Sequence, residues 1–408
     1  MLILSPLLLL FLVDASLAKI PLCIDIHNPL DLTQRNHIDC PLVHDLSLRQ
    51  QSPVGSSSAF SVDLQCIASS DFCIKAKNNL ARASEILAQH LSIKEPIRVS
   101  ATFLPFCSKD ANKNQDVCKK SGMMPSVGGA LPARMLLLQD DDNMLRVYPQ
   151  ALVKQMDISP RPQFNQYDIL MEFNSELPWH FLEDGPKLKY SNQTDFTHAV
   201  LHEMLHGLGF LSVFLEYPPN GKVLIPGGSA HLAAPSSGEV ATYFEGVFEK
   251  YMLKMPERKP VSSYTQTIAA AAKALFSNRT TPEEMTTALS TSPEFQASRD
   301  LLKFATTKDA LAILPFGGPM DDPVYLETSF APLKAGSSLS HISSTHYANT
   351  SEWLMLWRPE KNLAYEEAVR AYGGPIGPKT LRVLASLGYK TKGNLPMPPI
   401  PILPQDMI

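Results

Sequence analysis

The stretch that decides the fold is His198-Ala-Val-Leu-His-Glu-Met-Leu-His-Gly-Leu-Gly-Phe210. It contains the pattern His-Glu-x-x-His, with histidines at positions 202 and 206. Residues four apart share one face of a helix, so the imidazoles of His202 and His206 can reach the same metal ion. Glu203 projects beside them, where its carboxylate can take a proton from water bound to that metal. The apolar flanks are typical of a buried helix, and the two glycines indicate where it ends.

The elements expected around this helix are a mixture of strands and further helices. Alternating apolar residues predict strands, and apolar residues three or four apart predict amphipathic helices. A chain that mixes the two predicts a mixed sheet with helices packed on it, which is an α+β fold. We expect strands at 58–66, 96–106, 133–139 and 167–173, and helices at 71–90, 195–206, 238–254, 264–276, 282–304 and 376–388.

Composition divides the chain into six parts. The region after Phe210 is loosely patterned and reads as a long insertion with its own helices, and the Pro-rich end cannot continue a helix or a central strand. The expected parts are residues 1–18, a signal peptide; 19–56, an irregular N-terminal extension or propeptide; 57–210, an N-terminal catalytic subdomain with the His-Glu-x-x-His helix; 211–335, a helical insertion; 336–392, a C-terminal subdomain; and 393–408, an extended, flexible tail.

The ends and the cysteines indicate export. Residues 2–13 are almost wholly apolar and are followed by small residues up to Ala18, as in a secretory signal peptide. No later segment has the length of a transmembrane helix, so we expect a secreted, extracellular protein with no stable membrane span. Six cysteines fit three disulfides, and three sequons are candidate glycosylation sites. Short loops favour Cys66–Cys73 and Cys107–Cys118, which leaves Cys23–Cys40, and the sequons begin at Asn192, Asn278 and Asn349.

The charge balance argues against a nucleic-acid partner. The chain has 408 residues, with 36 Lys and Arg against 40 Asp and Glu, which gives a net charge of −4. Proteins that bind nucleic acids usually carry a basic surface instead. A hydrophobic fraction of 44% is enough for a packed core. We expect a globular protein and take it to be a monomer.

The third ligand of a catalytic metal has to come from far along the chain. A catalytic zinc takes three protein ligands and keeps one open position. In the compact pattern His-Glu-x-x-His-x-x-Gly-x-x-His the last position is Ser212, and serine is a poor zinc ligand. Downstream histidines are His231, His341 and His346. A glutamate is the alternative third ligand, and the candidates are Glu239 and Glu245.

Two motifs beyond the insertion resemble a known family. The segment Gly336-Ser-Ser-Leu-Ser-His341 precedes Trp353-Leu-Met355-Leu-Trp, and Ile376-Gly-Pro-Lys-Thr-Leu381 follows. Together with the His-Glu-x-x-His-x-x-Gly helix, these motifs resemble metzincin-type zinc metallopeptidases of the leishmanolysin-like arrangement, over about residues 58–389. The chain departs from that family in its insertion, and no cysteine-switch motif of the leishmanolysin propeptide type is visible.

The resemblance implies a fold and a set of site residues. The fold is a zincin-like mixed twisted sheet with an active-site helix and a C-terminal helical subdomain. His202, His206 and His341 are then the ligands of one catalytic Zn²⁺, with His346 as the alternative third ligand. Glu203 is then the general base, and Met355 is the methionine of the Met-turn beneath the metal.

The function predicted from these features is that of a secreted zinc-dependent endopeptidase. It would hydrolyse peptide bonds of a protein or peptide substrate with a zinc-activated water and Glu203 as the base. One alternative is a gluzincin-type zinc peptidase with a downstream glutamate as third ligand. The other is a non-catalytic secreted binding protein that retains a vestigial zinc site.

Weaker patterns carry two interpretations each. His198 lies one turn before His202 and is expected beside the metal ligands or at the surface. The stretch 168–174 is either an edge strand that binds extended substrate or a plain sheet strand. Residues 140–143 vaguely resemble a calcium loop, but a solvated turn is favoured. Trp357 and Tyr347 either line the cleft or pack in the core.

Overall fold

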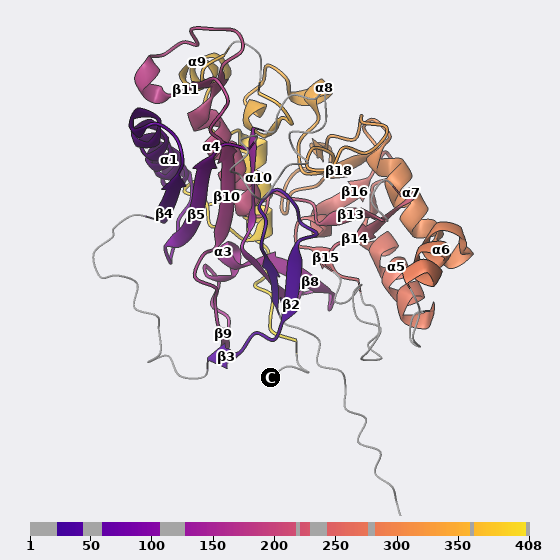
Figure 1. Cartoon of the computed structure of the whole chain (residues 1–408). Helices are drawn as coiled ribbons and strands as arrows, with labels where there is room; N and C mark the ends of the chain where they lie inside the picture. Colours follow the sequence, from indigo (N-terminus) through magenta and orange to yellow (C-terminus); the bar gives the residue numbers. More distant parts are fainter. Residues whose placement is uncertain are drawn as a thin grey trace, which may run out of the picture.

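A four-stranded mixed sheet, in the order β4-β5-β10-β6, lies beside the helix that carries the motif. It belongs to a computed structural model that describes residues 23–43, 59–106, 127–217, 221–228, 243–275, 282–359 and 363–404 (Figure 1). The first three strands are parallel, and β6 runs antiparallel to β10 at one edge. The strands are β4 (Phe60–Cys66), β5 (Ile97–Leu104), β10 (Ile169–Asn174) and β6 (Gly128–Pro132).

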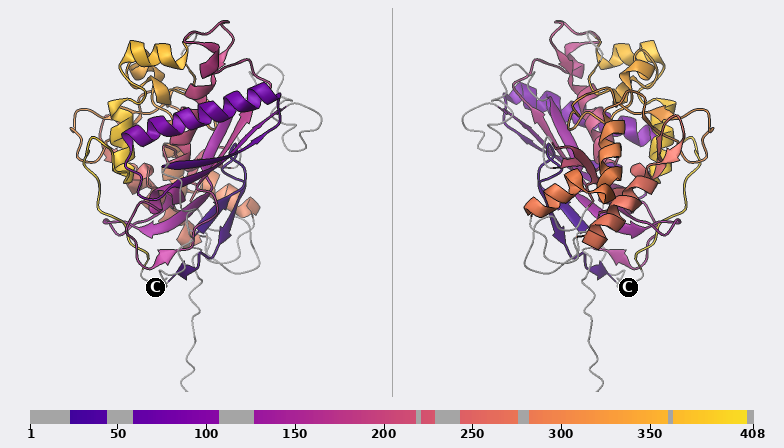
Figure 2. Two further views of the ribbon diagram at one scale, coloured as in Figure 1. Left: turned by 90° about the vertical axis from the view of Figure 1, so that its left-hand side faces the viewer. Right: turned by 90° about the vertical axis from the view of Figure 1, so that its right-hand side faces the viewer.

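Two helices pack on this sheet. Helix α1 (Ser70–His90) connects β4 to β5, and α4 (Phe196–Gly207) contacts α1, β6 and β10. The parallel pair β4 and β5 needs such a crossover, because a tight turn cannot join parallel strands. Figure 2 shows α1 lying across the strands. The buried Asn79 ties α1 to α4, since its Oδ1 accepts a hydrogen bond of 2.6 Å from Thr197 Oγ1.

A second, five-stranded sheet has the order β15-β8-β7-β1-β2. The disulfide Cys23–Cys40 closes the β1–β2 hairpin, and Ile24 and Ile26 are buried. Irregular structure is therefore the wrong expectation for this hairpin, whose first strand is part of the core. The strands are β1 (Cys23–Ile26), β2 (Arg35–Ile38), β7 (Arg134–Gln139), β8 (Leu145–Pro149) and β15 (Glu245–Gly246).

The insertion contains strands as well as helices. Its helices lie together on the side of the molecule away from α1 (Figures 1 and 2). Strands β16 to β19 form a four-stranded sheet in the order β17-β16-β18-β19, and β13 pairs with β14. The elements are β13 (Phe214–Tyr217), β14 (Val223–Pro226), β16 (Met252–Lys254), β17 (Lys259–Pro260), α5 (Ser262–Leu275), α6 (Pro282–Thr291), α7 (Gln296–Ala305), β18 (Leu311–Ile313) and β19 (Val324–Tyr325).

The helix expected at 238–254 is wrong. Residues 243–254 form β15, the 3₁₀ helix η3 (Glu249–Tyr251) and β16, and residues 238–242 lie outside the described part. The side chains of 243–249 are all buried, whereas an amphipathic helix would leave one face exposed. The helix expected at 282–304 is two helices, because Pro293 opens a separate 3₁₀ turn, η4 (Pro293–Phe295), between α6 and α7.

The C-terminal part is built of short helices and a docked tail. Ile402 exchanges two backbone hydrogen bonds with Gln139 on β7, of 2.8 and 2.9 Å, and Leu403 is buried. The tail is thus extended as expected, but residues 401–404 are held against the second sheet. The helices are α8 (Ser344–Tyr347), η5 (Trp353–Met355), α9 (Tyr365–Tyr372) and α10 (Pro378–Leu387). Short elements elsewhere are β3 (Leu42–Val43), α3 (Gln150–Val153), β9 (Arg161–Pro162), β11 (Trp179–His180), η2 (Leu182–Asp184) and β12 (Thr194–Asp195).

Most of the other expected elements are confirmed. The strands predicted around the motif correspond to β4, β5, β7 and β10, and the remaining helices to α1, α4, α5 and α10. The edge-strand interpretation of 168–174 is wrong, because β10 lies between β5 and β6. Its residues Ile169, Met171 and Phe173 are buried, while Leu170 and Glu172 between them are partly exposed.

Two of the three expected disulfides are confirmed. Cys23 is bonded to Cys40, and Cys66 to Cys73. Cys107 and Cys118 lie outside the described residues. Both disulfides fit a secreted protein. Among the described helices, none is long and apolar enough to cross a membrane.

A buried ion network joins the second sheet to the insertion. Arg146, which is 1% exposed, binds Asp140 at 3.0 Å and Glu245 at 2.7 Å, and also Asp142 at 2.7 Å. Lys250 adds a second cation at 2.5 Å from Asp140. The solvated turn expected at 140–143 is therefore wrong for Asp140, which is buried. The carboxylates of Asp140 and Asp142 form ion pairs with Arg146 and Lys250 of the same chain.

Replacing Arg146, the cation at the centre of this network, should therefore destabilise the protein strongly. In Arg146→Met, the carboxylates of Asp140 and Glu245 lose their principal partner while buried, and the free energy of unfolding should fall by about 3–5 kcal/mol. Urea denaturation followed by circular dichroism measures this. The control Arg82→Met removes only an exposed pair with Glu85 and should change stability by less than about 0.5 kcal/mol. Equal effects of the two substitutions would contradict the network's role.

Candidate metal centre

Helix α4 is fixed at both of its ends. At its start, Asp195 accepts hydrogen bonds of 2.9 Å from the backbone N–H groups of His198 and Tyr365. At its end, a Cβ on Gly207 would lie 2.3 Å from Ile169 Cγ2, so only glycine allows this approach of α4 to β10. Gly209, with φ +107°, then turns the chain away. The glycines of the motif are thus needed both for packing and for the helix stop.

Three histidines meet at one point beside α4. His202 Nε2 lies 3.0 Å from His341 Nε2 and 3.1 Å from His206 Nε2, and the remaining pair is 3.3 Å apart. The side chains of His202, His206 and His341 are only 9%, 5% and 4% exposed. Two of these residues come from α4, and His341 comes from 135 residues beyond His206. The chain therefore brings together the three histidines singled out by the sequence.

The far nitrogen of each ring is held by a backbone carbonyl. His202 Nδ1 lies 2.7 Å from Leu354 O, and His206 Nδ1 lies 2.7 Å from Phe210 O. His341 Nδ1 lies 2.9 Å from Ser337 O. A carbonyl only accepts, so each Nδ1 carries the proton and each Nε2 presents a lone pair. The three lone pairs therefore face one another in a buried place.

This donor set fits a zinc ion. Three lone pairs cannot satisfy one another by hydrogen bonds, whereas a cation between them would satisfy all three. Tetrahedral zinc with Zn–N bonds of about 2.0–2.1 Å requires nitrogens about 3.3 Å apart, close to the separations found here. Burial lowers the pKa of His202 to about 4 and that of His206 to about 3, and it also depresses the pKa of His341. The rings are thus neutral, as metal ligands must be.

Glu203 lies next to these ligands and faces the edge strand. Glu203 as a residue is of intermediate exposure, while His202 and His206 are almost covered. Burial raises the pKa of Glu203 to about 8, and a hydrogen bond from the backbone N–H of Ala130 on β6 opposes that rise. The carboxylate therefore stands between the metal ligands and the antiparallel edge of the central sheet.

The loop that carries His341 is organised by a buried glutamate. Glu327 exchanges backbone hydrogen bonds with the loop: its N–H donates to His341 O at 2.8 Å, and its carbonyl accepts from Leu339 N at 3.0 Å. Its carboxylate accepts hydrogen bonds from Ser329 N and Ser344 N, both of 3.1 Å. His341 is thus placed by an ordered loop.

A second buried glutamate, Glu352, explains the Ile-Gly-Pro-x-Thr-Leu motif. Its carboxylate accepts hydrogen bonds from Lys379 N at 2.8 Å and from Thr380 N at 2.9 Å, in the first turn of α10. The N-terminus of a helix favours such a negative charge. A Cβ on Gly377 would come within 2.2 Å of the Glu352 carboxylate, which requires glycine there. Sequence reasoning missed Glu352, because its partners Lys379 and Thr380 lie 27 and 28 residues further along the chain.

His346, the alternative ligand, lies elsewhere. Its Nε2 is 2.9 Å from Asp309 Oδ1, and its ring stacks on Tyr325 with a centroid distance of 4.4 Å. His231 and Glu239 lie outside the described residues. Glu245 is paired with Arg146 and so does not join the three histidines.

The other predicted residues take distinct positions. His198 is buried against the edge of Trp353, at 4.9 Å between ring centroids, and stays outside the ligand cluster. Met355 is fully buried in η5, directly after Leu354, and η5 packs on α4. Tyr347 packs in the core, where its hydroxyl donates to Pro323 O at 3.2 Å. Trp357 is half-buried. Asn192 and Asn349 are exposed, and Asn278 lies outside the described residues.

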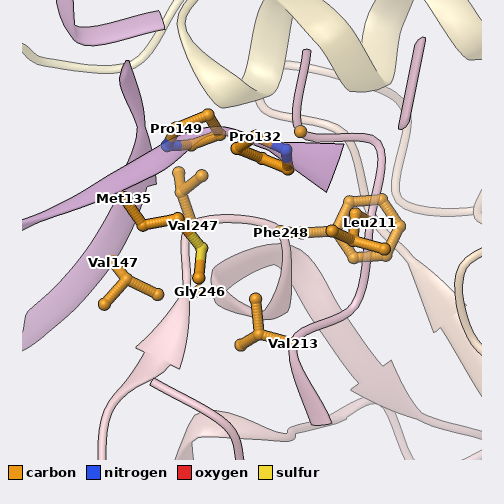
Figure 3. A pocket seen from close by; sticks show the side chains of 10 residues that line it. Pro132, Met135, Val147, Pro149, Leu211, Val213, Gly246, Val247 and Phe248 are labelled. Atoms are coloured by element: carbon orange, nitrogen blue, oxygen red, sulfur yellow. The ribbon is translucent and has the colours of Figure 1, made fainter. Parts of the chain in front are cut away.

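An apolar pocket lies on the other side of the turn that ends α4. Its empty volume is about 240 Å³, and Figure 3 shows side chains of β7, β8 and the chain around β15 pointing into it. The lining offers no charged or ligating side chain, so the pocket cannot supply chemistry to the histidines. It is lined by Pro132, Met135, Val147, Pro149, Gly209, Leu211, Val213, Gly246, Val247 and Phe248.

Comparison with known proteins places the chain in a family. Residues 23–401 match the family described as SPBPB7E8-like. The chain belongs to this family. It is also 27% identical over 333 residues to the uncharacterized protein PB7E8.01 of Schizosaccharomyces pombe. The match covers 75% of this chain and 57% of that protein, so the chain spans little more than half of its relative. No solved structure matches it significantly.

Replacing the carboxylate of Glu352 should weaken the support of the metal centre. Glu352→Gln keeps the shape but loses the charge that binds the N-terminus of α10, and should lower the free energy of unfolding by about 1–3 kcal/mol. Urea denaturation measures this. Glu257→Gln, which alters an exposed pair with Lys254, is the matched control and should stay within about 0.5 kcal/mol of wild type. Unchanged stability of Glu352→Gln would refute the capping role.

Proposed function

We propose that this protein is a secreted zinc-dependent endopeptidase with a metzincin-like arrangement. The observation that carries the proposal is the convergence of three Nε2 atoms, within 3.0–3.3 Å of one another, with Glu203 next to His202 on the same helix. A purely structural zinc site is usually closed by four protein ligands. Here the described residues offer three, and a carboxylate stands next to them.

The residues of the chain divide the work of peptide hydrolysis between them. His202, His206 and His341 would hold the ion, and their Nδ1–carbonyl bonds fix the direction of each lone pair. When bound, zinc supplies a Lewis acid and lowers the pKa of a coordinated water to about 7. A cation held by the histidines would lower the raised pKa of Glu203 and favour its carboxylate form. Glu203 would then be positioned to accept the proton of the attacking water and to return it to the leaving amine.

The substrate would bind along β6. This strand is the antiparallel edge of the central sheet, and an extended peptide can add to such an edge through backbone hydrogen bonds. Ala130 of β6 touches Glu203, so a peptide on this edge passes the catalytic carboxylate. The hairpin turn after β1 lies beside the same strand, because a Cβ on Gly129 would come within 2.7 Å of Leu30 Cδ2.

Two features support the metzincin-like reading over the alternatives. The third histidine follows a long insertion, and the fully buried Met355 adjoins the carbonyl that holds His202. The position of Glu245 in the Arg146 network disfavours a gluzincin arrangement through that residue. A non-catalytic zinc protein would not need the carboxylate of Glu203. The presence of Glu203 therefore disfavours that alternative.

The ligand assignment predicts the metal content of two matched variants. Wild-type protein should contain about one zinc per chain. His341→Ala should lose most of it, because two histidines remain, whereas His346→Ala should keep it, since His346 binds Asp309 instead. Plasma mass spectrometry on protein purified without added metal measures the stoichiometry. Loss of zinc from His346→Ala alone would reverse the assignment.

The mechanism predicts an inactive variant that still holds its metal. Glu203→Gln should retain zinc yet lower kcat for peptide hydrolysis by a factor of at least about 10². Hydrolysis of an unstructured protein, sensitive to 1,10-phenanthroline, is the assay. Glu85→Gln, at an exposed position of α1, should leave the rate unchanged. Full activity of zinc-loaded Glu203→Gln would refute the mechanism, and zinc without any chelator-sensitive proteolysis in wild type would favour a binding protein.

A further inference from the structure

A cluster of two cations and two aromatic rings stands on the two segments whose carbonyls hold the His341 and His202 rings. We call Phe330, Lys334, Trp357 and Arg358 the cation–indole cluster. Lys334 Nζ lies 4.1 Å from the centroid of the Trp357 ring, and the guanidinium carbon of Arg358 lies 4.8 Å from it. The Phe330 ring meets the indole edge to face, with centroids 5.0 Å apart. Lys334 and Arg358 are exposed, and both rings are half-buried.

The segment that carries Lys334, the first arm of the cluster, also holds the ring of His341, the proposed third metal ligand. Lys334 O accepts hydrogen bonds from Ser337 N at 3.0 Å and Ser338 N at 2.8 Å, and Lys334 N donates to Ser338 Oγ at 3.1 Å. These bonds close a tight turn. The carbonyl of Ser337, in that same turn, holds the His341 ring. Lys334 is close enough for its charge to act on the His341 ring.

The segment that carries Trp357, the second arm of the cluster, also holds the ring of His202, the proposed first metal ligand. Trp357 follows three residues after Leu354, whose carbonyl holds the His202 ring. The two arms lie side by side, because Ile342 forms bridges with both Leu326 and Leu356. The cluster thus extends from the two backbone segments that orient His341 and His202, and its position relative to the metal is set by the same hydrogen bonds.

The charges of the cluster have no carboxylate partner within the described part of the chain. Neither Lys334 nor Arg358 forms an ion pair there, in contrast to Arg146, Lys154 and Lys250. The nearby Glu327 is buried, and its oxygens are occupied by Ser329 and Ser344. Two positive charges over a single indole repel each other, and an anion placed between them would be bound by both.

We propose that the cation–indole cluster binds a carboxylate of the peptide substrate next to the scissile bond. The inference rests on the proposed peptidase function and deepens it, because it names acidic peptides as the preferred substrates. The carboxylate has two possible sources, an Asp or Glu side chain or the C-terminus of a peptide. Lys334 and Arg358 supply the charge, and the Trp357 ring holds the two cations close to one another.

Paired peptides test the proposal. Peptides that differ only by Glu or Gln at one position on either side of the cleaved bond are compared, each with a free or an amidated C-terminus. We expect kcat/KM to be about tenfold higher for the acidic member at one position. In Lys334→Met the ratio of acidic to amide peptide should fall to about one, while Lys334→Arg should preserve it. The exposed Lys77→Met on α1 should leave the ratio as in wild type.

A binding experiment separates this inference from the proposed function. In zinc-loaded Glu203→Gln, the Kd of the same peptides can be measured without turnover by calorimetry. The acidic member should bind about tenfold more tightly, and the added substitution Lys334→Met should remove the difference. A preference that follows the free C-terminus instead of the side chain assigns the cluster to the terminal carboxylate.

Distinct outcomes refute the two hypotheses. Equal kcat/KM and Kd values for acidic and amide peptides, or a ratio that survives Lys334→Met, overturn the carboxylate site while the peptidase stands. If wild-type protein shows no chelator-sensitive hydrolysis, the proposed peptidase function is refuted. The ratio of the Kd values for acidic and amide peptides in Glu203→Gln then still decides whether the cluster selects acidic peptides.

Discussion

The whole site depends on three hydrogen bonds from imidazole Nδ1 atoms to backbone carbonyls. The carbonyls belong to Phe210, Ser337 and Leu354, in three separate turns of the chain. Each bond fixes the tautomer and the rotation of one ring, so the direction of every metal-facing lone pair is set by backbone geometry. The arrangement of the three histidines can be no more precise than these turns, and much of the surrounding structure serves to hold them.

Buried carboxylates hold the turns. Glu352 joins the segment of Leu354 to the start of α10, and Glu327 joins the segment of Ser337 and His341 to its neighbours. Near the turn of Phe210, Glu249 accepts backbone hydrogen bonds of 2.9 Å from Val213 and Gly246, and burial raises its pKa to about 7. Each is costly to bury alone but fully hydrogen-bonded, which rigidifies its surroundings. The site is therefore supported by polar anchors as well as by the apolar core.

The sequence could predict the parts of the site that are encoded locally. The spacing of His202 and His206 fixes a shared helix face, and the strand patterns around it are strong because one face is buried. The grouping of His341 with them could be expected only from a resemblance, since 135 residues separate it from His206. Glu352 and Glu327 were not predictable, because a glutamate that caps a distant segment has no sequence signal that distinguishes it from a surface glutamate.

The expected elements that proved wrong also depend on contacts between segments far apart in the sequence. Glu245 and Glu249 stand four residues apart in a largely apolar stretch, as on the polar face of a helix, yet both are buried in the structure. The β1 strand is only four residues long, and it pairs with β7 more than a hundred positions away. The interior position of β10 depends on β6, whose Gly-Gly-Ala-Leu-Pro sequence has low strand propensity and is held by its neighbours. Tertiary pairing decided each of these elements.

The length of the insertion is compatible with a precise site because its ends are fixed independently of its middle. Ser212 N donates to Ser340 Oγ at 3.1 Å, next to both His341 and the turn that ends α4. The entropic cost of closing a loop grows slowly, by only about 0.6 kcal/mol for each doubling of its length. A long insertion therefore adds little to the cost of bringing His341 to α4. Its shape is instead constrained where it touches the sheet, through Glu245 and Lys250 in the network of Arg146 and Asp140. The insertion can thus differ widely between related proteins while the three imidazoles keep their arrangement.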